Sequence, residues 1–143
     1  MTDSNFRNVC ILFEMTCVEK FDGFKQWGPG NNGDPELNII NHYNKHVMSN
    51  DGISKDENWK DYLEYLDIES YKNFALDKSK CMTNRIVHSN GNRVYLSGIY
   101  KNILIIGRLD ENDQLGISSC YIIHDHLFEK KLAAFEKNKC FSF

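Results

Sequence analysis

The spacing of apolar residues changes near Thr83 and divides the chain into two parts. Before Thr83, apolar residues recur every three or four positions, which is the period of an amphipathic helix. After it, they fall into short runs separated by turn-forming residues, which is typical of strands. The sequence therefore predicts helices first and a sheet afterwards.

Two helices and a short helical piece are expected before the sheet. The first spans residues 35–48, with Asp34 as its N-cap and Pro35 in its first turn. The second spans residues 56–66 and presents a solvated acidic face, and a short piece follows over residues 70–76. The apolar positions that define the two helices are Leu37, Ile40, Tyr43, Val47, Trp59, Tyr62, Leu63 and Leu66.

Four antiparallel strands are expected after Thr83. Turn formers at residues 89–92 predict a hairpin, and the uninterrupted apolar run over residues 103–106 indicates a central strand. A last helix is expected over residues 126–138. The fold class is then α+β, with N-terminal helices, a four-stranded antiparallel sheet and a C-terminal helix. The strands are predicted at residues 84–88, 93–98, 102–109 and 115–123.

The first 34 residues are interpreted as an N-terminal extension and loop. Residues 6–21 form an apolar segment that suits core packing, as either a strand or a helix. Residues 23–35 are rich in turn formers but lack the Gly-Lys-Ser/Thr end of a phosphate-binding loop, so a plain connection is expected. The whole chain, residues 1–143, is predicted to be one domain, with residues 35–143 as its core.

The overall charge bears on function. A net charge of −3 does not suggest a nucleic-acid binder. The charge is unevenly distributed along the chain. Residues 1–35 carry three basic and five acidic groups (−2), residues 36–82 carry six and nine (−3), and residues 83–143 carry eight and six (+2). The strand half is therefore mildly basic, and a local patch there can attract phosphate.

The five cysteines are widely spaced and include no Cys-x-x-Cys pair, so free thiols in a reducing compartment are expected, with a disulfide as the alternative. His42 and His46 are four residues apart, but no third metal ligand is recognisable beside them, and we expect no metal and no cofactor. The apolar segment over residues 9–18 is shorter than the roughly 20 residues that a membrane span needs, so no membrane association is expected. It also lacks the features of a signal peptide.

Two motifs stand in a recognisable order. The first is the run Tyr43-Asn44-Lys45-His46 on the first predicted helix, followed by Trp59 and Tyr62. The second lies in the predicted sheet and consists of Arg93-Val94-Tyr95, the run over residues 102–106, and Ser119-Cys120-Tyr121. Over roughly residues 37–123 the chain thereby resembles the colicin D-like RNase toxins. These belong to the barnase–colicin–RelE superfamily and recur at the C-termini of contact-dependent inhibition toxins.

The resemblance implies a catalytic role for His46, a phosphate contact for Lys45 and a polar position beside the scissile phosphate for Ser119. Tyr121 would take the place of a tryptophan found in colicin D. The sequence departs from the family in two respects. Such domains are usually basic, and the Lys that normally precedes the Lys-His pair by two residues is replaced by Tyr43.

These residue types suit metal-independent cleavage of RNA, whose 2′-OH supplies the nucleophile. A histidine can move the proton, a lysine stabilises charge on the phosphorane, and a hydroxyl adds a hydrogen bond. The products would be a 2′,3′-cyclic phosphate and a 5′-OH. We expect His46, at a partly exposed helix position, to share one cleft with Ser119, with Lys45 at the rim and His42 contributing much less. Further substrate contacts are expected from Arg85, His88 and Arg93.

The resemblance also implies tRNA as the first substrate to test, a cognate immunity or antitoxin protein as partner, and a cytoplasmic site of action. Delivery as the C-terminal part of a secreted toxin would fit the same family. Two other interpretations stay open. An acidic chain suits a non-catalytic immunity-type protein that binds a basic nuclease, and a toxin fold can also lose its chemistry. Nuclease activity abolished by one histidine change would favour the enzyme.

Overall fold

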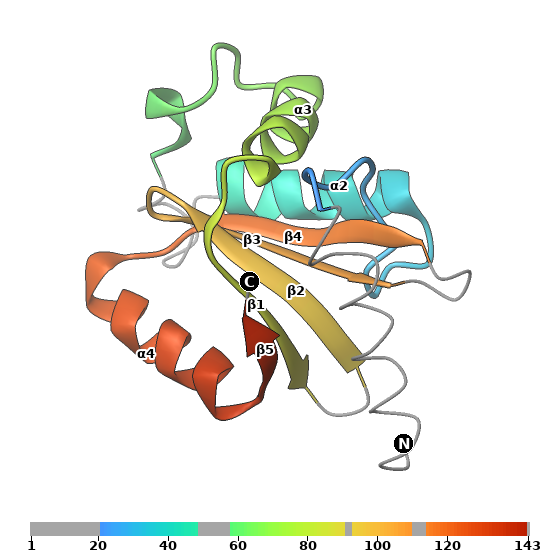
Figure 1. The fold of residues 1–143 in the computed structure, drawn as a ribbon. Helices are drawn as coiled ribbons and strands as arrows, with labels where there is room; N and C mark the ends of the chain where they lie inside the picture. The colour runs from blue at the N-terminus through green and yellow to red at the C-terminus, as the bar shows by residue number, and fades with distance from the viewer. Residues whose placement is uncertain (1–20, 49–57, 91–92, 110–113, 143) are drawn as a thin grey trace.

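The computed structural model describes residues 21–48, 58–90, 93–109 and 114–142, and its sheet lies between two helical layers (Figure 1). Helices α2 and α3 cover one face of the sheet, and α4 lies on the other. The elements are α2 (Pro35–Tyr43), a π-helix (Asn44–Met48), a 3-10 turn (Trp59–Asp61), α3 (Ile68–Ser79), β1 (Thr83–Asn90), β2 (Arg93–Tyr100), β3 (Ile103–Leu109), β4 (Leu115–Ile122), α4 (Asp125–Lys137) and β5 (Lys139–Ser142).

The α+β class is confirmed, with four antiparallel strands that are neighbours in chain order. The complete sheet has the order β4-β3-β2-β1-β5, so a fifth short strand extends it beyond β1. This strand pairs antiparallel with β1, for example through Val87 and Phe141. It was not predicted, because four residues at the end of a chain are too few to establish an alternating pattern.

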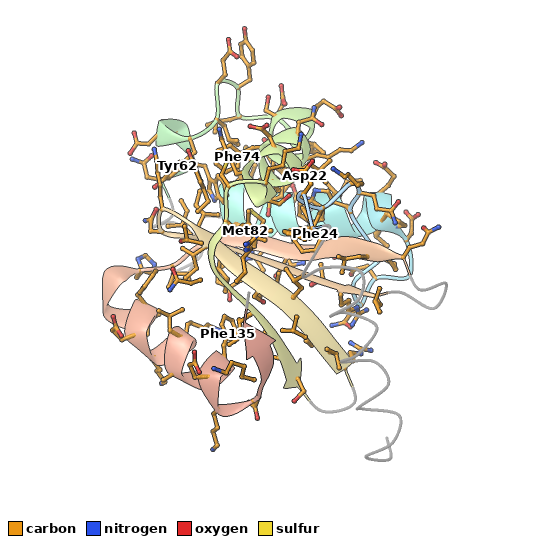
Figure 2. The ribbon with its side chains drawn as sticks, viewed as in Figure 1. Asp22, Phe24, Tyr62, Phe74, Met82 and Phe135 are labelled. Atoms are coloured by element: carbon orange, nitrogen blue, oxygen red, sulfur yellow. The ribbon has the colours of Figure 1, made fainter. Side chains whose placement is uncertain are left out.

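The two faces of the sheet carry separate apolar clusters. Ile103 and Ile105 belong to the larger cluster, beneath α2 and α3, while Leu104 belongs to the smaller cluster beneath α4. Successive side chains of a strand point to opposite faces, so an uninterrupted apolar run is what a strand buried on both faces requires. Figure 2 shows the same division: Phe74 and Phe135 lie on opposite sides of the sheet.

The first predicted helix is present, and its start is capped as expected. The Asp34 carboxylate accepts a hydrogen bond from the Leu37 backbone N–H at 3.1 Å, and Pro35 opens the helix. The α-helix ends at Tyr43, however, and the wider π-helical winding continues to Met48. The Lys45-His46 pair therefore lies on a π-helical segment, and such segments are frequent at functional sites.

The second predicted helix is wrong over residues 58–66, where only the 3-10 turn is helical; residues 56 and 57 lie outside the described part of the chain. Trp59 and Leu63 are buried as expected, but Leu66 is 41% exposed. The helix begins later because Asp67 caps it by accepting a hydrogen bond from the Ser70 backbone N–H. The expected short helical piece at residues 70–76 is consequently the middle of a longer helix, α3.

The loop that precedes α2 is more than a connection. Phe24 and Trp27 are buried in the larger cluster, although the glycine-rich composition around them suggested only turns. Trp27 forms a parallel bridge to Ile117, and the Gly28 backbone N–H donates to the Ile117 carbonyl at 2.9 Å. The loop therefore extends the sheet along the free edge of β4 and fixes the start of α2 beside that strand. The apolar segment at residues 6–21 lies outside the described residues except for Phe21, which is partly buried and packs against the larger cluster.

Within the described residues, Cys81 is exposed and Cys120 is buried, and both are free thiols. Cys10, Cys17 and the side chain of Cys140 lie outside the described part of the chain. None of the helices in the described ranges has the length and apolar character needed to cross a membrane.

Candidate functional site

One row of side chains on α2 and the π-helix faces the edge strand β4. The Asn38 side-chain amide donates to the carbonyls of Ser118, at 3.2 Å, and Gly28, at 3.0 Å. Eight residues later the His46 ring stacks on Tyr121, with centroids 5.1 Å apart. Helix and strand therefore run in the same direction, and His42, midway along the row, comes beside the middle of β4.

A cavity of about 280 Å³ opens between this row, the loop before α2 and the part of the sheet that α4 leaves uncovered. Its floor includes Ile106. Among the residues that the structure describes, no carboxylate lines it. The sheet contributes the polar side chains of His88, Tyr95, Arg108 and Ser119, and the other walls contribute those of Asn31, Asn32, Asn38 and His42.

His42 is held neutral at physiological pH. Burial, together with the positive charges of His46 and Lys45, lowers the pKa of His42 to about 4. Its Nδ1 atom is buried and has no hydrogen-bond partner among the described residues. A protonated ring would have to leave that N–H unpaired in a region that excludes water, which is costly.

His88 is neutral for a related reason. Burial lowers the pKa of His88 to about 4. Its Nε2 atom shares a hydrogen bond of 2.7 Å with the Ser97 hydroxyl, so only Nδ1 remains for a ligand. The ring stacks between Tyr95, at 5.7 Å, and Phe135 of α4, at 4.3 Å. Both cavity histidines are therefore uncharged at neutral pH, and Arg108 supplies the full positive charge on the described walls.

His46 lies one ring away from the cavity rather than on its wall. It stacks between His42, at 5.7 Å, and Tyr121, at 5.1 Å, with both pairs of rings nearly parallel. The expectation of a partly exposed position is wrong, because the residue is only 6% exposed. The stack explains the burial, since a ring on each side covers both faces of the imidazole. A group that approaches the His46 imidazole must therefore reach it at the edge of the ring.

Some of the other predicted site residues line the cavity, and some do not. Ser119 and His88 both line the cavity, and Tyr121 joins them through its stack with His46. Arg93 is exposed and donates a hydrogen bond to the Asn31 side chain at the rim. Lys45 is exposed and Arg85 is half-buried on β1, and neither is among the residues that line the cavity.

Sequence reasoning missed several wall residues. Arg108 was the only charged residue in the third predicted strand, which was a usable signal, because a charged side chain is rarely fully buried without a partner. Asn31 and Asn32 were indistinguishable from ordinary turn formers. Asn38 and the wall position of His42 could not be inferred, because both depend on how α2 lies against β4.

A second cavity, of about 210 Å³, lies at the opposite end of β4. It is lined by Asp61, Tyr62 and His124, among others, and the Asn58 side chain donates to the Asp61 carboxylate at 2.9 Å. His124, expected as part of a strand-to-helix connection, also precedes α4 as its N-cap without a side-chain capping bond. This histidine is thus set apart from the first cavity.

No group of three or more His, Cys, Asp or Glu side chains within the described ranges is arranged to hold a metal ion. No protein-family model, curated protein or solved structure matches the chain. The chemistry of the first cavity therefore has to be inferred from its own residues. A single positive charge, neutral imidazoles, hydroxyls and several amides form a setting that can bind an anion and transfer a proton.

Proposed function

We propose that the protein is a metal-independent endoribonuclease that leaves a 2′,3′-cyclic phosphate and a 5′-OH, with tRNA as the first substrate to test. One observation carries the proposal. The cavity gathers two histidines, Ser119 and Arg108 without a carboxylate on its described walls, in a chain whose net charge is −3. Such a setting favours a phosphodiester over a cationic ligand.

In this proposal His46 accepts the 2′-OH proton as the 2′-oxygen bonds to phosphorus, and it donates a proton to the 5′-oxygen as the P–O5′ bond breaks. The neutral His42 ring beside it holds the imidazole in place, and the Tyr121 ring holds its other face. Ser119 donates a hydrogen bond that stabilises the charge developing on the phosphorane, and the positive charge of Arg108 attracts the RNA strand into the cavity. Lys45, exposed next to His46, contacts a flanking phosphate. The 2′-OH of the RNA is the nucleophile, so the chain needs no further group.

The proposal predicts that His46→Gln lowers the cleavage rate by at least about a hundredfold, the lower end of what a positioned acid or base contributes. Gln is preferred to Ala because the ring is buried in a stack, and a small residue would leave a hole there. Cleavage of labelled tRNA in EDTA measures the rate. His124→Gln, in the second cavity, is the matched control and should cleave like the wild type. Equal rates for the two variants would remove His46 from the mechanism.

A toxin of this type requires a neutralising partner, so the proposal includes a cognate immunity or antitoxin protein. An active ribonuclease would otherwise degrade the RNA of the cell that makes it. The mouth of the cavity is where such an inhibitor would act most directly. Co-expression with the protein encoded beside it, followed by copurification, is the appropriate search.

A second candidate function is supported by the segment before α3. Asp61, Glu64 and Asp67 are exposed there, and Tyr65 between them is 62% exposed. An exposed aromatic residue among carboxylates suits the surface of a protein that binds a basic nuclease without cleaving RNA itself. Tight binding to a basic nuclease by a chain that leaves RNA intact would favour this immunity-type function.

A further inference from the structure

Two arginines converge on one neutral oxygen at the loop end of the cavity. Arg93 opens β2, and Arg108 stands near the end of β3, where it pairs with Tyr95. An Nη1 atom of each guanidinium donates to the Asn31 side-chain oxygen, that of Arg108 at 3.5 Å. Arg108 also donates through Nη2 to the Gly30 carbonyl. The two side chains thus share a single acceptor on the loop.

The two positive charges are not balanced by a full negative charge on the residue that they share. Two positive charges at one site repel each other, and an amide oxygen offers only a partial negative charge in return. Within the described residues, no ion pair joins either guanidinium to a carboxylate. A charged phosphate oxygen would bind the same two donors more strongly, because hydrogen bonds between ionised groups are about twice as strong as neutral ones.

We propose that Arg93 and Arg108 bind a phosphate group of the RNA strand, at the position that the Asn31 oxygen marks. This inference rests on the proposed function and adds a second subsite to it. In the sheet register, Arg108 pairs with Gly116 and Leu104 with Tyr121. Those pairs are four residues apart along β3, or about 13 Å at roughly 3.3 Å per residue. The arginine pair therefore binds a phosphate further along the strand than the scissile one beside His46.

The substitution Asn31→Asp tests this subsite because it places a carboxylate oxygen where the two arginines already converge. The internal carboxylate should neutralise the pair and exclude an external phosphate. The probe is a 2′-O-methyl oligoribonucleotide, which lacks the nucleophile and cannot be cleaved. Its affinity should fall by at least about tenfold, and the slope of log K against log salt should shrink by roughly 0.7 for each phosphate that the variant no longer binds.

Gln114→Glu is the matched control. It makes the same change from amide to carboxylate at an exposed residue whose side-chain oxygen accepts a hydrogen bond, here from Gln26. Both variants change the net charge from −3 to −4, since each adds one negative charge. Gln114→Glu should lower the affinity less than about twofold, because its carboxylate does not occupy the acceptor position that the two arginines share, and an exposed charge is screened by salt. Equal losses of affinity in the two variants, or none in Asn31→Asp, would overturn the subsite.

Inorganic phosphate, tested separately, distinguishes a free phosphate from a strand. The wild type should bind the oligonucleotide more tightly than inorganic phosphate; equal affinities would overturn the assignment to RNA. Failure of the subsite can be distinguished from failure of the proposed function. If the wild type cleaves RNA and Asn31→Asp binds the oligonucleotide normally, only the subsite is wrong. If the wild type never cleaves RNA but Asn31→Asp alone loses oligonucleotide binding, the subsite stands and the ribonuclease proposal fails.

Discussion

At the residue scale, His42 and His88 tie the stability of the fold to pH. Burial lowers the pKa of each from 6.5 to about 4. Between these values the unfolded chain binds protons that the folded chain does not, so stability rises with pH. Above pH 6.5 both histidines are neutral in the folded and the unfolded chain, so they cost no stability. As the pH falls from 6.5 towards 4, they progressively lower the free energy of unfolding.

We therefore predict that the free energy of unfolding falls as the pH is lowered from 7.5 to 5.5, by roughly 1 kcal/mol for each of the two histidines. Urea denaturation at the two pH values measures the change. His42→Gln and His88→Gln should each remove their own share, because glutamine does not titrate. A pH dependence that is unchanged in both variants would show that neither histidine is held neutral by the fold.

At the residue scale, the sequence identified some residues that line the cavity and missed others. Ser119 and His88 were predicted as site residues and do line the cavity. His42 was expected to matter little, yet it lines the cavity while His46 stands behind it. Two histidines on one helical face look equivalent in a sequence. Only the lateral position of α2 against β4 determines which ring borders the opening, and that position depends on the loop around Trp27.

At the element scale, Asn38 connects α2, the preceding loop and β4. It is fully buried, and its amide donates to the carbonyls of Gly28 and Ser118. Its side-chain oxygen accepts a hydrogen bond from Asn32 at 2.8 Å. One side chain thus holds together three of the segments that form the cavity.

We predict that Asn38→Ala lowers the free energy of unfolding by about 2–4 kcal/mol, because it leaves buried polar groups without this partner. Asn41→Ala is the matched control on the same helix: its side chain is exposed and donates one hydrogen bond, to Asn32. It should cost less than about 1 kcal/mol. Urea denaturation of both variants gives the comparison. Similar reductions in the two would mean that Asn38 does not hold these segments together.

Elements with a strong local signal were predictable. The cap at Asp34 and the alternation of the strands depend on neighbouring residues, so the sequence displays them directly. The helix expected at residues 56–66 failed because Trp59 and Leu63 are anchored by tertiary packing on the sheet and α3, which helical spacing alone does not distinguish from a helix face. Phe24 was missed as a core residue for the same reason, since it is buried from within a loop.

At the scale of the whole molecule, the distribution of charge reconciles an acidic chain with a phosphate ligand. The acidic residues before α3 are exposed on the layer of α2 and α3, whereas Arg93 and Arg108 lie at the cavity. A net charge of −3 hides this separation, because it sums groups that face different directions. The mildly basic strand half was a partial signal, and the cavity that uses it could only be found in the folded chain.

The most direct test of the ribonuclease account is the fate of RNA incubated with the purified wild-type chain in excess EDTA. Separate reactions with tRNA, ribosomal RNA and a single-stranded RNA should be followed by analysis of the new ends. The account predicts cleavage of at least one of these, with tRNA cut first, leaving 2′,3′-cyclic phosphate and 5′-OH ends. If all three RNAs stay intact both in EDTA and with added divalent metal, the protein is not the enzyme proposed here.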